Sequence, residues 1–249
     1  METARDDLLL ICVNYRKPVE TARFVSSARE QTLNSALHVI VVDNSPPDGE
    51  GGVPEAVRDD PHVTTIAPGK NLGYFGGAAV ALDIHRGSEP AVLAPSIRTL
   101  NSGVDQNPYM RVRPDAWRIR LNSRIFSIYP VDAVYQGLSW IKHRSLDGVA
   151  KERPATTAGF ATKIYAPHGS FIALHRTYFE KGGTLDYGAF LFGEEIFVAE
   201  TASRLGLTVL YEPGVVIEHT ERSTAKGLWN RDISRYRRQA SRYLARKFF

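Results

Sequence analysis

The sequence predicts an α/β protein with an open, mainly parallel sheet flanked by helices. Two continuous apolar runs, at 8–13 and 39–42, are typical of strands that are buried on both faces. A helical pattern at 18–28 separates them, so the two strands are expected to be parallel with a right-handed crossover. The composition agrees, since 43% hydrophobic and 23% charged residues are ordinary for a folded domain.

The elements follow in order along the chain. Pro18 fits the first turn of a helix, and Ala22, Val25 and Ala28 then mark one helical face. The further elements expected are a short helix at 53–58, a strand at 63–66, a glycine-rich loop at 69–77, a helix at 78–85, a strand at 91–94, a polar loop to 108, helices and loops outside the sheet at 114–153, a strand at 170–174, a helix at 194–205, and short strands at 208–211 and 215–217 on either side of Pro213.

The positive charge of the chain is concentrated at 230–249. This segment holds seven basic residues and one acidic residue, a net +6, so the remainder of a chain with a net charge of +4 sums to −2. Ile233, Tyr236, Ala240, Tyr243 and Leu244 recur at helical spacing between the arginines. We therefore expect one domain at 1–229 and a basic amphipathic helix at 230–249. Such a helix suits an anionic membrane surface or an acidic partner, or it packs its apolar stripe on the core.

Other features bear on where the protein works. The apolar run at 8–13 is too short to cross a bilayer, and 1–7 is polar with no apolar signal region behind it. The single cysteine, Cys12, allows no intrachain disulfide. The prediction is a cytoplasmic protein, peripheral on the inner face of the cell membrane if the basic helix binds lipid. Because the basicity belongs to the tail and not to the fold, nucleic acid is not an expected partner.

Polar side chains follow the first three predicted strands. Asn14 ends the first strand, Asp43 and Asn44 end the second, and Asn71 follows the third. Ligands bind at the carboxyl edge of an open parallel sheet, and Asp43 suits a ribose hydroxyl or the polar edge of a base. The same residues also favour an ordinary turn before two prolines. Asp43 alone does not decide between these readings.

A glycine-rich loop runs from Asn71 through Gly73 to Gly77 and opens a helix. Close backbone approach and free amides there can receive a diphosphate. The loop is not the dinucleotide fingerprint, and the exit of the first strand has no glycine, which disfavours a nicotinamide-dependent oxidoreductase. The sequence also lacks a P-loop.

Three further residues are candidates for chemistry. Glu194 and Glu195 open a helix, and either one would accept a proton from a hydroxyl as a general base. The helix dipole stabilises their carboxylate forms, and on the sequence alone the favoured interpretation is that these acidic residues merely support a helix N-terminus. His219 follows a predicted strand as a candidate metal ligand, although a lone histidine is weak evidence.

Together these segments resemble a family 2 glycosyltransferase with the GT-A fold, within it the rhamnosyltransferase-like enzymes of bacterial cell-surface polysaccharide synthesis. The matching segments are VNYRKP (13–18), VIVVDNS (39–45), KNLGYFGGA (70–78), LAPSI (93–97), DQNPYM (105–110), IYAPHGSFI (164–172), FLFGEEIFVAE (190–200) and YEPGVVIEH (211–219). They cover most of the chain in the order that the family has.

The resemblance implies inverting transfer of a sugar from a nucleoside diphosphate to a hydroxyl of a lipid-linked or glycan acceptor. Asp43 would contact the nucleotide with Asn14 and Asn44 nearby, and Asn71 and Gly73 would line the donor site. Glu195 matches the position of the base, with Glu194 beside it. His219 matches the histidine that helps to bind the metal or diphosphate.

One departure from the family pattern concerns the metal. The family carries an Asp-x-Asp motif that holds Mg²⁺ or Mn²⁺ against the diphosphate, and this sequence has none. The predicted helix at 78–85 leads almost directly into the strand at 91–94, so the motif and one central strand are missing. The chain resembles a family member with an internal deletion. Its rival readings are an inactive nucleotide- or glycan-binding remnant and a truncated product with no independent role.

Overall fold

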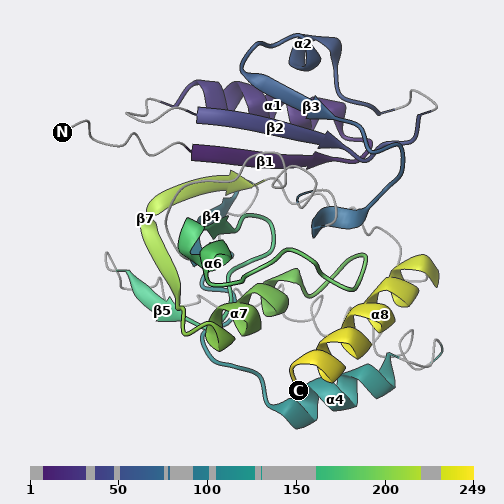
Figure 1. Cartoon of the computed structure of the whole chain (residues 1–249), viewed down its shortest axis with the longest axis vertical. Helices are drawn as coiled ribbons and strands as arrows, with labels where there is room; N and C mark the ends of the chain where they lie inside the picture. Colours follow the sequence, from purple (N-terminus) through teal and green to yellow (C-terminus); the bar gives the residue numbers. More distant parts are fainter. Residues whose placement is uncertain are drawn as a thin grey trace. The chain divides into compact units, whose positions relative to one another are not determined.

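The computed structural model describes residues 8–31, 37–47, 51–75, 78, 92–100, 105–126, 130, 161–219 and 231–249. The chain divides into two compact units (Figure 1). Unit 1 comprises Met1–Pro90, His175–Glu180 and Thr184–Phe190, and unit 2 comprises Ala91–Leu174, Lys181–Gly183 and Leu191–Phe249.

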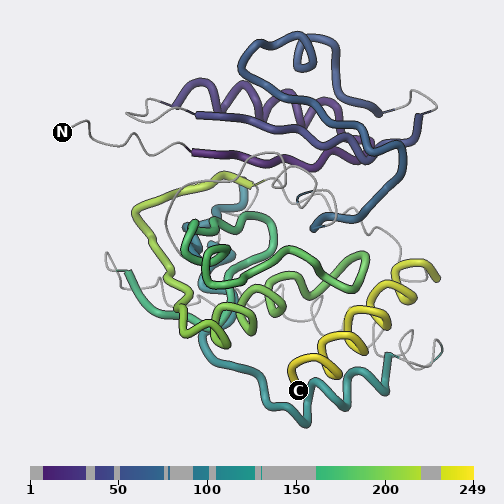
Figure 2. Tube along the Cα trace, viewed as in Figure 1, coloured from purple at the N-terminus to yellow at the C-terminus, as the bar shows by residue number. Residues whose placement is uncertain are grey.

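Unit 1 is built on a three-stranded parallel sheet in the order β1-β2-β3. The arrows of the three strands point the same way in Figure 1, and Figure 2 shows the trace of their backbone. The strands are β1 (Leu8–Asn14), β2 (Leu37–Asp43) and β3 (Val63–Ile66). Helix α1 (Pro18–Arg29) connects the first two, with Pro18 in its first turn. The predicted parallel β-α-β unit is confirmed.

Successive side chains of β2 point to opposite faces of the sheet and form two apolar layers in unit 1. Val39 and Val41 face Val25 and Ala28 of α1, together with Val57 of the short helix α2 (Glu55–Arg58). Ile40 and Val42 face the other side of the sheet and pack with partly buried residues of β1 and β3. All four β2 residues are at most 2% exposed, so this strand anchors the unit. The carboxyl ends of β1 and β2 are thereby held beside each other.

Unit 2 contains a four-stranded mixed sheet in the order β5-β7-β4-β6. Strand β4 (Val92–Thr99) pairs in parallel with β7 (Val209–His219). Strands β5 (Thr162–Ile164) and β6 (Ala173–Leu174) add antiparallel edges. The described strands therefore form two open sheets.

Several element boundaries differ from the sequence expectations. Strand β4 continues through Thr99, where a polar loop was expected, because Asp105 accepts hydrogen bonds from Ser96 and from the backbone of Ile97. Strand β7 is one element whose register shifts opposite Pro95 and Ser96, so Pro213 interrupts the pairing without ending the strand. The expected strand at 170–174 shortens to β6. Strand β5 and the short helix α6 (Arg176–Glu180) were not predicted.

Other expectations fall wholly or largely outside the described residues. The predicted helix at 78–85 lies beyond the description except for Ala78, whereas residues 73–75 are already helical. Of the segment 114–153, helix α4 (Ala116–Ile125) is described and agrees with the prediction. The division into 1–229 and a separate tail stays a prediction.

The basic segment forms helix α8 (Arg231–Lys247), which packs within unit 2. Ala240, Leu244 and Phe248 are buried, and the rings of Tyr243 and Phe248 contact the ring of Phe197 in helix α7 (Glu194–Arg204). Helix α8 also contacts α4. The sequence left open whether this helix binds an external partner or packs its apolar stripe on the core, and the structure shows the packing.

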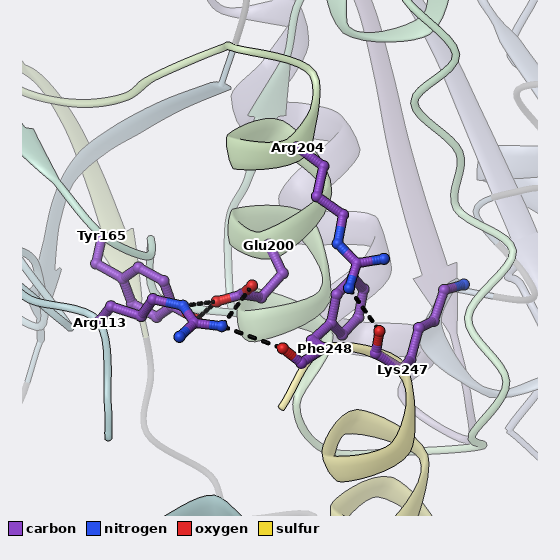
Figure 3. Close-up of polar contacts among 6 residues, drawn as sticks. All are labelled: Arg113, Tyr165, Glu200, Arg204, Lys247 and Phe248. Atoms are coloured by element: carbon purple, nitrogen blue, oxygen red, sulfur yellow. Dashed lines mark hydrogen bonds and ion pairs between the residues drawn. The ribbon is translucent and has the colours of Figure 1, made fainter. Parts of the chain in front are cut away.

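Polar contacts fasten the end of α8 to α7 (Figure 3). Arg113 binds the buried carboxylate of Glu200 through two hydrogen bonds of 2.6 and 3.0 Å, and it donates a third, of 3.2 Å, to the carbonyl of Phe248. The Tyr165 hydroxyl also donates to Glu200, at 2.7 Å. Arg204 donates to the carbonyl of Lys247 at 2.6 Å. We call these contacts the α7–α8 clamp.

None of the described helices is long and apolar enough to cross a membrane.

The clamp yields a test of stability. The Glu200 side chain is 6% exposed and that of Arg113 is 48% exposed, so Arg113→Met leaves a buried carboxylate without its cation. We expect a loss of about 2 kcal/mol in the free energy of unfolding, less than for a wholly buried pair. Arg118→Met is the matched control, because Arg118 and Asp115 are both largely exposed, and it should change stability by about 0.5 kcal/mol at most. Equal losses in urea unfolding would contradict a structural role for the clamp.

Candidate functional site

Asn14 organises the carboxyl edge of the sheet in unit 1. It is 1% exposed, and its Nδ2 donates to Asp43 Oδ1 at 2.9 Å, Ser45 Oγ at 3.0 Å and the Gly51 carbonyl at 3.0 Å. Its Oδ1 accepts from the Thr21 hydroxyl at 2.9 Å. The amide of Asn14 is therefore engaged within the protein and holds the end of β2 against the end of β1.

Asp43 is held as a carboxylate at this edge. Besides Asn14, the Ser45 backbone N–H donates to Oδ1 at 3.0 Å and the Val53 N–H to Oδ2 at 2.8 Å. Burial opposes ionisation, but these hydrogen bonds outweigh it and hold the pKa of Asp43 below its ordinary value. Asp43 remains only partly buried, so an ionised carboxylate with lone pairs to spare lies at the strand tip.

The glycine-rich loop is tied to the same edge. Asn44 is buried, and its Nδ2 donates to the Gly73 carbonyl at 2.9 Å, while Asn71 Oδ1 accepts from the Gly73 N–H at 3.0 Å. Gly73 has φ +77°, and a Cβ there would collide with the Phe190 carbonyl. Glycine is thus required for both its conformation and its lack of a side chain. The structure brings together the five donor-site residues that the sequence predicts.

The predicted acidic pair opens α7 in unit 2. The preceding residues, Phe192 and Gly193, both have positive φ, of 74° and 84°. A left-handed phenylalanine costs roughly 1–3 kcal/mol, and such strain concentrates at functional sites. Glu194 is 6% exposed, Glu195 is partly buried, and Oε1 of Glu194 has no hydrogen-bond partner within the described part of the chain.

Burial controls the protonation of both glutamates. The N-terminus of α7 favours their carboxylate forms, as the sequence suggested. Desolvation is nevertheless the larger effect and raises the pKa of Glu194 to about 7. It also raises the pKa of Glu195. A raised pKa is what a carboxylate needs to accept a proton near neutral pH.

A polar turn lies over the start of α7. A Cβ at Gly169 would lie 3.4 Å from Glu195 Oε2, so the backbone of this turn is next to the carboxylate. In the same turn His168 Nδ1 is 2.8 Å from Ser170 Oγ, and the Tyr109 ring meets the His168 ring edge-on at 5.3 Å. Burial raises the pKa of Tyr109, and the nearby charge of Glu195 adds to this effect.

Residues outside the predicted set position this turn. Asp105 accepts hydrogen bonds from Ser96 at 2.7 Å and Tyr211 at 2.8 Å, which ties β4 to β7. The buried Asn107 donates to the Pro95 carbonyl and accepts from the His168 N–H, both within 2.9 Å. Both belong to DQNPYM, so the motif itself was the available signal. Its residues support the turn that covers Glu195.

His219 occupies the end of β7 and pairs with Thr99 of β4, and its carbonyl accepts from the Leu100 N–H at 3.0 Å. The strand-end position is confirmed. Its role toward metal or diphosphate stays a prediction. A cleft shared by Asp43, Asn71 and Glu195 also stays a prediction, because the first two belong to unit 1 and the third to unit 2.

The described residues do not fit the expected Mg²⁺ or Mn²⁺ site. No group of three or more histidine, cysteine, aspartate or glutamate side chains gathers anywhere in that part of the chain. Together with the missing Asp-x-Asp motif, this donor set does not supply a carboxylate cage for a divalent cation.

Comparison with known proteins supports the fold. A crystal structure of GalNAc-T7 with UDP, GalNAc and Mn²⁺ superposes with a TM-score of 0.54 at 14% sequence identity. The match covers 89% of this chain and 45% of that chain. No family profile matches the sequence, and neither does any curated protein. The chain therefore has an α/β fold with open sheets that resembles the GT-A fold of glycosyltransferases.

The buried glutamate gives a pH-dependence that can be measured. The pKa of Glu194 is about 7 in the folded protein and 4.5 in the unfolded chain. The protonated side chain therefore stabilises the fold fully below pH 4.5, and this contribution is lost as the pH rises through about 7. The amide introduced by Glu194→Gln does not titrate in this pH range. The difference in unfolding free energy between Glu194→Gln and wild type should therefore grow in favour of the variant by roughly 3 kcal/mol from pH 4.5 to 8.

The same measurement on Glu55→Gln, an exposed position in α2, provides the control. A curve for Glu194→Gln that is no steeper than the curve for Glu55→Gln would show that the native state does not desolvate the Glu194 carboxyl group.

Proposed function

We propose that this protein transfers a sugar from a nucleoside-diphosphate sugar to an acceptor hydroxyl, with Glu195 as the general base. The observation that carries the proposal is the desolvated Glu194–Glu195 pair at the start of α7, under the turn that contains His168 and Gly169. The pair occurs in a fold that resembles GT-A enzymes, one of which was solved with UDP, GalNAc and Mn²⁺. The residue pattern of rhamnosyltransferase-like enzymes supports cell-surface polysaccharide synthesis as the setting.

The chemistry is a single displacement at the anomeric carbon. Glu195 takes the proton of the acceptor hydroxyl while the acceptor oxygen forms a bond to that carbon from the face opposite the diphosphate. The bond between the carbon and the diphosphate oxygen breaks, and the nucleoside diphosphate leaves with the electron pair. One displacement inverts the anomeric configuration. Glu194, whose pKa is about 7, lies beside Glu195, so the charge next to the base changes with pH.

The donor would bind at the strand tips of unit 1. Asp43 is ionised and positioned by Asn14, which suits a ribose hydroxyl or a base edge. The glycine-rich loop would line the diphosphate, and the hydrogen bonds of Asn44 and Asn71 to Gly73 fix the shape of the start of this loop. The acceptor is proposed to be a hydroxyl of a lipid-linked or free glycan, because these are the acceptors expected for the family that the sequence resembles.

The absence of the metal-binding Asp-x-Asp motif favours a second candidate function. The missing metal-binding carboxylates are the family's means of neutralising the leaving diphosphate, and the described residues do not replace them. The alternative is an inactive module that binds a nucleotide or a glycan. Calorimetry with UDP- and dTDP-sugars, with and without Mn²⁺, followed by product analysis, separates the two. Binding without transfer or hydrolysis would support the module, and tight Mn²⁺-dependent binding would show that a metal site exists.

Glu195→Gln tests the catalytic assignment. Because the amide cannot accept the acceptor proton, we expect transfer to fall by about 100- to 10,000-fold while donor affinity stays unchanged. In the wild type, kcat/KM should rise with pH across the raised pKa of Glu195, above the range of an ordinary glutamate. Initial rates with the donor identified by a thermal-shift screen provide the measurement.

Glu180→Gln is the control, since Glu180 is an exposed glutamate at the end of α6. It should transfer sugar at the wild-type rate. If Glu195→Gln does the same, Glu195 is not the base.

A further inference from the structure

The exposed side of α8 is a ridge of arginines. They recur every three or four residues, which places them on one face of the helix: Arg231, Arg235, Arg238, Arg242 and Arg246. Four are exposed and Arg238 is partly exposed. The opposite side, with Ala240 and Leu244, is buried in unit 2. Packing of α8 therefore turns its charge outward and leaves its apolar stripe unavailable for insertion into a membrane.

The neighbouring helix α4 presents apolar side chains as well as charge. Trp117 is 60% exposed and Leu121, one turn later, is 45% exposed. Arg120 and Arg124 are exposed on the same side of the helix, three and seven residues after Trp117. No residue of α4 is buried. A large aromatic ring and a leucine held in water beside arginines are typical of a helix that lies in the interface of a membrane.

The two helices concentrate the positive charge of the chain. They contact each other within unit 2, and α8 lies next to α4 in Figure 1. Together they hold ten basic residues and one acidic residue, a net +9 in a chain of +4, so the rest of the chain sums to −5. A surface of this kind is attracted to an anionic plane while the remainder of the protein is repelled from it.

We propose that the exposed residues of α4 and α8 form a surface that binds an anionic lipid bilayer. The arginine ridge of α8 contacts phosphate headgroups, and Trp117 and Leu121 enter the headgroup boundary. The apolar pair favours a bilayer over a nucleic acid or an acidic protein, for which arginines alone would suffice. Helix α8 is fastened along α7, which carries Glu195. If the proposed function holds, binding of α8 to the bilayer would therefore keep Glu195 near a lipid-linked acceptor.

The test is co-sedimentation of the full chain with phosphatidylcholine vesicles, with and without phosphatidylglycerol. We expect binding only to the anionic vesicles, weakened by high salt. Each arginine near an anionic surface contributes about fivefold, so Arg235→Gln/Arg242→Gln/Arg246→Gln should bind about 100-fold more weakly. The matched control, Arg23→Gln/Arg58→Gln/Lys181→Gln, removes the same charge from exposed positions elsewhere and should bind as wild type does.

Trp117 supplies an independent readout. Trp117→Ala should weaken binding, and Trp117→Phe should remove the part of the fluorescence blue shift that anionic vesicles induce at this residue. Thermal melts establish that each variant folds, and none of the replaced side chains belongs to the α7–α8 clamp or to the proposed site.

Three results would overturn the proposal, and none depends on sugar transfer. The first is equal binding to neutral and anionic vesicles. The second is the same loss in both charge triples. The third is retention on duplex DNA or an acidic peptide through the α8 ridge without any vesicle binding, which would assign the surface to another polyanion.

Discussion

Removal of the Glu194–Glu195 pair from water is the constraint on which the proposed chemistry depends. Helix α7 is buried at most of its positions, so its first turn cannot move outward to solvate the carboxylates. The turn at Gly169 lies next to Glu195, the DQNPYM segment fixes that turn, and the α7–α8 clamp holds the far end of the helix. Stability and reactivity are thereby coupled, because the packing that makes α7 rigid also raises the pKa of its glutamates.

The sequence predicts unit 1 well because its signals are local. A continuous apolar run needs no partner to be read as a buried strand, and Pro18 marks where α1 begins. Unit 2 is harder because distant residues decide its boundaries. Strand β4 extends to Thr99 because Asp105 and β7 satisfy its backbone and side chains, and β7 passes Pro213 because the pairing resumes beyond it. Neither effect leaves a pattern in the strand itself.

The site shows the same division. Asp43, Asn71 and Glu195 are predicted from their motifs, but the protonation of the two carboxyl groups depends on burial that no spacing reveals. The dipole argument favours ionised glutamates, and desolvation reverses it. Glu200 and Arg113 are separated by 87 positions, so their ion pair has no signature in the sequence. For the basic segment, the structure selects one of the two sequence interpretations, a docked helix with its apolar side buried, and this helix contacts α4.

The most direct measurement is a pH titration of the glutamate side-chain carboxyl carbons by ¹³C NMR, with Glu194→Gln and Glu195→Gln used to assign the two signals. The structure predicts that both signals titrate above the range of ordinary glutamates, Glu194 near pH 7. Titration of both signals near 4.3, the value for a solvated glutamate, would contradict the burial of the pair and with it the general-base assignment.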